Sequence, residues 1–340
     1  MPVRLNRQSY SNYLLMYANP FRTYRRTHIA LTALLFVFAL TFTACKKQDN
    51  PITVPAPETI IQKISGNSRL TLLTAAINRA GLATTLSGTG PFTVFAPSDD
   101  AFRAAGFADV TAINAAPVAT LTTILLYHVV NGTVVPAGQT AQPTALTTNG
   151  AVYVSKGVPT GGGTGVSVNG ARVIQADVPA SNGVIDIIDR VLMPPAGTVL
   201  AVVQADTSLR LLVAAALRGG TAVTSALGGT TPLTVFAPTN AAFRAAGFPD
   251  TTAINAAQVT ALTGILTNHV VPNTRAYSPT FTNGAAITTF GGGSLTVTVG
   301  TGNALSVTSP RSGTNVSRVI TPDINATNGV IHKIDRVLLP

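Results

Sequence analysis

The stretch Thr-Val-Phe-Ala-Pro-Ser at residues 93–98, closely followed by Ala-Phe-Arg-Ala-Ala-Gly-Phe at residues 101–107, decides how this chain is organised. The first part recurs as Thr-Val-Phe-Ala-Pro-Thr at residues 234–239, and the second recurs unchanged at residues 242–248. Both parts recur 141 residues later in the chain, since 234 − 93 and 242 − 101 are both 141. Self-similarity at a fixed offset indicates that a structural unit is duplicated.

Two further landmarks extend the repeat toward the end of the chain. His-Val-Val at residues 128–130 recurs at residues 269–271, with the same offset. Asn-Gly-Val-Ile at residues 182–185 recurs at residues 328–331, where the offset is larger. The second copy therefore carries a net insertion between these landmarks.

The repeat predicts two domains, at residues 58–194 and 196–340. Met-Pro-Pro-Ala-Gly at residues 193–197 marks the boundary, because Pro and Gly interrupt regular structure. The chain has 340 residues, of which 46% are hydrophobic, so it can fill two ordinary cores. Glycine-rich stretches at residues 161–163 and 291–293 lie in the variable part, and we expect both to be exposed turns.

Within each unit, the pattern predicts helices first and strands afterwards. Apolar residues at helical spacing in residues 72–80 indicate a helix, and residues 212–217 repeat its apolar face. A short strand at residues 92–95 ends before Pro97. Ser98 is then expected to cap the following helix, with the acids of its first turn favouring the helix dipole.

The later half of each unit has the pattern of a sheet. Residues 118–130 predict a helix that runs into a strand. Apolar residues then alternate with polar ones, as half-buried strands require; they are Val152, Val154, Val166 and Val168 in the first unit and Leu295, Val297 and Val299 in the second. Closing strands are expected at residues 184–192 and 330–339. The predicted class is α+β.

The N-terminal residues 1–44 are typical of an export signal. Arginines precede an apolar run at residues 29–42, which is shorter than the roughly 20 residues of a membrane span. Small residues directly before Cys45, the only cysteine, predict lipidation there, with residues 45–57 as a Pro-rich tether. The alternatives are a plain secretory signal with a chance cysteine, or a short anchor helix. Translation is expected to start at Met1 or at Met16.

Charge and cysteine content bear on two questions, namely whether the protein binds nucleic acid and whether disulfides stabilise it. The net charge of +10 includes five arginines that precede Cys45, and the remaining charges are scattered singly. This distribution argues against a nucleic-acid partner. A single cysteine excludes an intramolecular disulfide, so stability must come from core packing.

These motifs resemble the fasciclin (FAS1) domain family. The first family motif stands at residues 93–102 and again at residues 234–243. Its Tyr-His pair is present as Tyr127-His128, whereas the second copy has Asn268-His269. The closing motif Asn-Gly-Val-Ile-His is intact at residues 328–332, but Asp186 replaces its histidine in the first copy.

The resemblance implies, for each copy, a β-sandwich or wedge with helices packed along one edge. It also implies a role, because fasciclin domains occur in secreted or surface-anchored proteins that mediate adhesion or contact with matrix and polysaccharide. Fold alone does not fix function, so this remains an expectation by analogy.

Two segments are candidates for an interaction surface. Tyr127, His128 and His269 form the first, although a histidine in so apolar a run is also expected to be buried and bonded to the backbone. Pro322, Asp323 and Ile324 resemble an integrin-contacting segment of animal matrix fasciclins, and the alternative is a turn that enters a strand. The repeated acids Asp189 and Asp335 are interpreted as structural hydrogen-bond acceptors.

No catalytic, metal or cofactor site is predicted. No histidine has a second ligand at metal-binding spacing, and the Gly-x-Ser-x-Gly motif is absent. The leading hypothesis is a lipid-anchored adhesion protein of a bacterial cell envelope that binds polysaccharide or a surface or matrix protein, with two domains raising its avidity. The alternative is an envelope lipoprotein that captures a small solute or cofactor in an apolar pocket between sheet and helices.

Overall fold

The computed structural model describes residues 56–134, 144–147, 149–157, 164–312 and 316–340. Residues 56–340 form one compact unit that contains both copies. The predicted signal, Cys45 and the glycine stretch at residues 161–163 lie outside the described residues. In the described part of the chain, no single helix could cross a membrane, although Val199–Ala205 and Thr207–Arg218, bent by 98° at their junction, together have the necessary length and composition.

Helices precede most of the strands in each copy, as the pattern predicts. In the first copy the helices are α2 (Ile60–Ser65), α3 (Thr71–Ala80), α4 (Ala83–Leu86), α5 (Asp99–Ala104), α6 (Val110–Ala115) and α7 (Val118–Tyr127). Its strands are β1 (Phe92–Pro97), β2 (Val129–Asn131), β3 (Thr144–Thr147), β4 (Gly150–Lys156), β5 (Val166–Val168), β6 (Ala171–Ala180) and β7 (Gly183–Ile188).

The second copy repeats this order. Its helices are α8 (Val199–Ala205), α9 (Arg210–Arg218), α10 (Thr221–Gly228), α11 (Asn240–Ala245), α12 (Thr251–Ala256) and α13 (Val259–Asn268). Its strands are β8 (Leu233–Pro238), β9 (Val270–Pro272), β10 (Ala286–Thr288), β11 (Ser294–Val299), β12 (Leu305–Thr308), β13 (Ser317–Ala326) and β14 (Gly329–Ile334). The closing strands β7 and β14 therefore end earlier than the sequence predicts.

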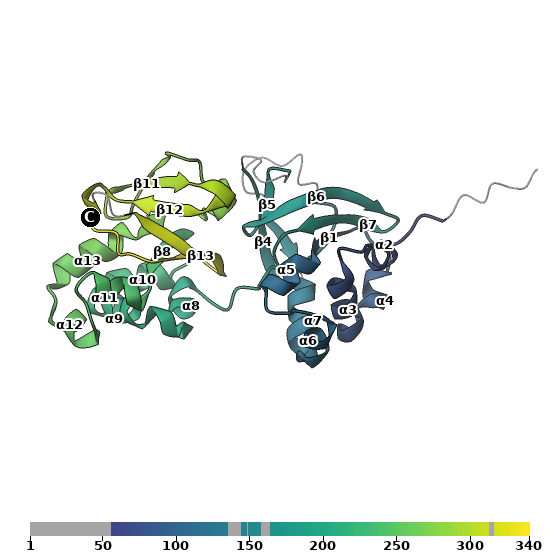
Figure 1. Ribbon diagram of the computed structural model, residues 1–340, viewed down its shortest axis with the longest axis horizontal. Coiled ribbons are helices and arrows are strands. Elements are labelled where there is room, and N and C mark those ends of the chain that lie inside the picture. Colours follow the sequence, from purple (N-terminus) through teal and green to yellow (C-terminus); the bar gives the residue numbers. More distant parts are fainter. Residues whose placement is uncertain (1–55, 135–143, 148, 158–163, 313–315) are drawn as a thin grey trace, which may run out of the picture. The chain divides into compact units, whose positions relative to one another are not determined.

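The strands of each copy pair in one continuous series. In the first copy β1 pairs with β2 and, in parallel, with β7, so the series closes into a barrel. The second copy has the order β10-β11-β12-β13-β14-β8-β9. Figure 1 shows helices α3, α6 and α7 gathered beside the sheet of the first copy. The expected α+β fasciclin fold, with its helices to one side, is confirmed.

Ser98 and Thr239 stand at the end of the first motif's strand and cap the helix that follows it. Ser98 accepts a hydrogen bond from the Ala101 N–H at 3.2 Å, and Thr239 caps α11 in the same way. Asp99 has a role beyond the helix dipole, because its carboxylate accepts the Leu72 N–H at 2.8 Å at the start of α3. The strand-turn-helix motif therefore fixes a second helix as well.

Apolar residues from both layers fill the cores. Leu72, Leu73, Ala76 and Ile77 of α3 are buried against Phe102, and the alternating Val152, Val154, Val166 and Val168 are buried inside the barrel. The predicted patterns thus mark the buried faces correctly. The glycines at residues 291–293 form a turn, and it is hydrogen-bonded to the end of α13 through Gly291 N–H and the Thr267 carbonyl.

Candidate functional site

The two predicted histidines lie inside the fold at the ends of α7 and α13. Both are 2% exposed. His128 Nδ1 contacts the Ile124 carbonyl at 2.8 Å, while its Nε2 accepts the Leu192 N–H at 2.9 Å. His269 repeats both bonds, the second of them with Leu338 N–H at 2.9 Å. Each ring joins a helix end to the chain after the closing strand, as the buried interpretation expects.

Burial sets the protonation of these histidines. Because a charged imidazole would lose its hydration, burial lowers the pKa of His128 and of His269 to about 4. An acceptor Nε2 likewise requires the neutral ring with its proton on Nδ1. At neutral pH both therefore serve as uncharged structural links, and neither contributes to an exposed surface.

Tyr127 lies at the contact between the two copies. Its hydroxyl donates to the Ala151 carbonyl at 2.8 Å and accepts bonds from Asn169 Nδ2 and Asn325 Nδ2, each at 2.9 Å. Tyr277 donates to Asn325 Oδ1 at 3.0 Å. Burial raises the pKa of Tyr127 to about 12, so the phenol stays protonated. A hydrogen-bonded chain of two tyrosines and two asparagines thus joins the copies.

Asp323 connects the second predicted segment to the first copy. It adopts a left-handed backbone conformation with φ of 62°, at a register shift in the pairing of β13 with β14. Arg190 of the first copy donates to Asp323 Oδ2 at 2.8 Å, and the Ser278 N–H donates to Oδ1 at 2.6 Å. The carboxylate is fully buried within this ion pair. Residues 322–324 are therefore hydrogen-bonded to neighbouring residues and are also partly exposed.

Gly170 permits the close approach of Asp323. A Cβ atom at Gly170 would lie 2.3 Å from Asp323 Cγ, and its φ of +82° also favours glycine. On the other side of the contact, the Arg275 guanidinium lies 4.3 Å from the centre of the Tyr153 ring. Arg275 also donates to the Ala326 carbonyl at 2.9 Å, which fixes the guanidinium in place.

Sequence reasoning missed Asn169, Gly170, Arg275 and Tyr277. A signal for them does exist in the sequence. Some residues of the contact differ from their counterparts in the other copy, and Arg275 stands where the first copy has Val134. Asn325 likewise stands where the first copy has Pro179.

A cleft of about 310 Å³ opens beside this contact, and we call it the inter-copy cleft. Its lining includes Asn169, Arg190, Met193, Val202, Asp323 and Ile324. Met193 is 45% exposed and the Arg190 side chain is 41% exposed, so the cleft offers an apolar thioether beside a guanidinium group, while the Asp323 carboxylate that pairs with Arg190 is fully buried. Of the predicted surface residues, Asp323 and Ile324 line it directly, and Tyr127 is hydrogen-bonded to its Asn169 and Asn325.

Metal ligands do not gather in the part of the chain that the structure describes. No group of three or more His, Cys, Asp or Glu side chains there could hold an ion. The nearest approach is His332 and Asp323, whose Nδ1 and Oδ1 atoms are 3.9 Å apart. Burial lowers the pKa of His332, which favours the neutral imidazole.

Both copies match one known protein family. A family model described as Fasciclin domain matches residues 68–194 and 209–340. Protein sll1483 of Synechocystis is 40% identical over 139 residues, which are 40% of this chain and 74% of that protein. Transforming growth factor-beta-induced protein ig-h3 of Sus scrofa is 28% identical over 270 residues, which are 75% of this chain. The match spans only 35% of ig-h3.

One solved structure is a FAS1 domain pair from the insect cell adhesion molecule Fasciclin I. It is 20% identical, with a TM-score of 0.40, and the similarity covers 79% of this chain and 96% of that one.

Proposed function

Because this chain belongs to the fasciclin family, we propose that it is a non-catalytic adhesion protein that binds polysaccharide or a surface or matrix protein through the inter-copy cleft. The family supplies the class of function. The cleft supports this binding location, because it contains Asp323 and Ile324 of the predicted interaction segment beside residues of the first copy.

The chemistry of the cleft suits a ligand with both hydroxyl groups and apolar faces. The Asn325 amide and the Arg190 guanidinium, which line the cleft and are not fully buried, donate and accept hydrogen bonds in fixed directions. Met193 and Ile324 add apolar surface against which the carbon face of a sugar or an aliphatic side chain packs. Polysaccharide meets both requirements and is our first choice of partner.

The cleft exists only where both copies meet. Asn169 and Arg190 come from the first copy, while Asp323 and Ile324 come from the second. The hydrogen bonds through Tyr127 and Tyr277 hold these walls together. The tandem arrangement therefore builds one composite site, in addition to any avidity gained from two separate ones.

Substitution of Met193 by Glu tests the site. Residues 56–340 are expected to bind polysaccharide extracted from the producing organism, and M193E is expected to weaken that binding by roughly tenfold or more, because it places an unpaired charge in the contact. Val110, which is also 45% exposed but lies on α6, provides the matched control V110E. Biolayer interferometry measures both. Equal weakening by the two variants would contradict the proposed site.

The lipid anchor at Cys45 and an envelope location complete the proposal. The small residues before Cys45 and the apolar run at residues 29–42 support it. We expect Cys45→Ser to move the protein from the membrane fraction to the soluble fraction of the producing cells, because the acylated thiol is lost. Cell fractionation with immunoblotting checks this result. Retention of the variant in membranes would instead favour an uncleaved anchor helix.

A further inference from the structure

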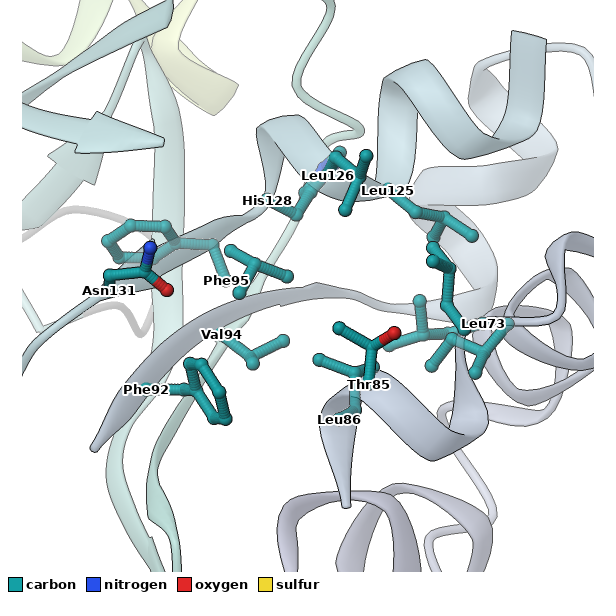
Figure 2. Close-up of a pocket in the computed structure, with 13 residues that line it drawn as sticks. Leu73, Thr85, Leu86, Phe92, Val94, Phe95, Leu125, Leu126, His128 and Asn131 are labelled. Carbon is teal, nitrogen blue, oxygen red and sulfur yellow. The ribbon is translucent and has the colours of Figure 1, made fainter. Parts of the chain in front are cut away.

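Each copy contains an apolar cavity at an equivalent position. In the first copy a cavity of about 60 Å³ lies between α3, α4, β1 and α7, and Figure 2 shows leucines of these helices pointing toward the strand residues Phe92 and Val94. In the second copy a cavity of about 110 Å³ lies between α10, α13 and β9. Six pairs of lining residues match across the repeat: Leu82 and Val223, Thr85 and Ala226, Leu86 and Leu227, Leu125 and Leu266, Leu126 and Thr267, and Val129 and Val270.

The lining of the cavity in the second copy is mostly apolar and favours a hydrocarbon group. No charged residue lines it. The Thr267 hydroxyl on its wall already donates within α13, with the Thr263 carbonyl at 2.9 Å. A charged group placed inside would therefore lose its hydration without gaining a charged partner. Smaller side chains at Ala226 and Thr267, where the first copy has threonine and leucine, give this cavity its greater volume.

Phe290 lies at the same cavity and is 57% exposed. Its N–H donates to the Val270 carbonyl at 2.7 Å, and the Gly291 N–H donates to the Thr267 carbonyl at 3.1 Å. A Cβ atom at Gly291 would lie 2.8 Å from Thr267 Oγ1. The glycine turn predicted from the sequence therefore seats an exposed aromatic ring against the cavity wall.

A basic residue directly precedes the backbone that lies against this apolar site. Arg218 is exposed in the last turn of α9 and directly precedes Gly219. A Cβ atom at Gly219 would lie 3.0 Å from Leu266 Cδ1 and 3.3 Å from Val223 Cγ2, both of which belong to cavity-lining residues. Among the described residues Arg218 has no ion-pair partner. An apolar cavity next to a cation is complementary to an amphiphilic anion.

We propose that the cavity of the second copy binds the hydrocarbon chain of a fatty acid, whose carboxylate lies near Arg218 and whose middle carbons cover Phe290. A dry apolar cavity of roughly 150 Å³ admits a benzene ring, so the present one holds a few methylene groups of the chain. This activity is separate from adhesion at the inter-copy cleft and does not depend on it.

Isothermal titration of residues 56–340 with dodecanoate, below its micelle concentration, tests the proposal. We expect saturable binding that Ala226→Leu weakens at least tenfold, because the new side chain fills the cavity. Ser225→Leu adds the same side chain at the neighbouring, exposed position of α10 and is expected to leave binding unchanged. Undiminished binding by A226L, or no saturable binding by the unaltered protein, would overturn the proposal.

The charge is tested separately with Arg218→Gln. This variant is expected to weaken dodecanoate binding severalfold and to leave dodecanol binding unchanged, since the alcohol has no charge. An equal loss for both ligands would overturn the assigned role of Arg218. If the unaltered protein instead forms dimers that Phe290→Ser abolishes, and dodecanoate does not compete with them, the cavity is a self-association surface and the fatty-acid proposal is wrong.

Discussion

Asp186 and His332 occupy equivalent places in the two closing strands, yet their surroundings differ. His332 stacks on Phe236 with ring centres 5.5 Å apart, and its Nε2 bonds to the Ala276 carbonyl at 2.8 Å. Asp186 accepts the Asp177 N–H at 2.8 Å through one oxygen, while the other has no hydrogen-bond partner among the described residues. The first copy thus buries a carboxyl group that is only partly satisfied.

This carboxyl group makes stability depend on pH. Burial, which outweighs the Asp177 N–H bond, raises the pKa of Asp186 to about 6 from 3.8. A raised folded-state pKa contributes stability that is complete below the unfolded value and is lost as pH rises through the folded value. Ionised Asp186 therefore destabilises the first copy above about pH 6.

We expect Asp186→Asn to raise the free energy of unfolding by roughly 1–3 kcal/mol at pH 8, because the amide removes the buried ionised carboxylate, and to have little effect at pH 4. Thermal unfolding followed by circular dichroism at both pH values measures this. Asp100→Asn removes the same charge from a side chain that is 94% exposed and serves as the control. A gain for D186N that is equal at pH 4 and pH 8 would rule out ionisation as the cause.

Single residues also show what the sequence could predict. Ser98 and Thr239 cap their helices as expected, because capping depends on neighbours within three residues. The partners of Asp99 and of His128 lie 27 and 64 residues away, and no local pattern reveals such distances. Burial of an imidazole was expected from its apolar run, whereas the identity of its partner required the fold.

Among the elements, the helices were the most predictable. Helix α7 begins at Val118 and ends at Tyr127, inside the range that the sequence predicts, and β2 follows it directly. Strands β7 and β14 were predicted too long, because apolar residues continue beyond their ends. Leu192 and Leu338, for example, are buried outside the strands and bond to the histidines through their N–H groups. A hydrophobic pattern marks buried residues, and residues stay buried beyond the last paired residue of a strand.

The sequence predicts that the loops are turns but not what they contact. The turn at residues 291–293 is exposed at Gly291 and Gly292, as expected, and it is also hydrogen-bonded to α13 beside Phe290. Glycine content identifies a turn but not the surface on which the turn rests. The two cavities, in contrast, follow from the repeat itself, since equivalent helices frame both.

Across the whole molecule, the repeat predicted the two copies and their fold, but not the contact between them. Repeated motifs describe what the copies share. Part of the contact depends on residues that they do not share, such as Asn325, which bonds to Tyr127, and Arg275, which lies over Tyr153. The sequence therefore singles out the segment around Asp323 as a candidate but does not predict its bonds to Arg190 and Ser278.

Hydrogen–deuterium exchange of residues 56–340, with and without polysaccharide from the producing organism, tests the composite site most directly. We predict slower exchange on binding at residues 190–196 and 322–325, which form the two walls of the inter-copy cleft. Helices α6 and α12 should exchange at unchanged rates. Saturable binding with protection confined to those helices, or to one copy alone, would contradict a site built by both copies.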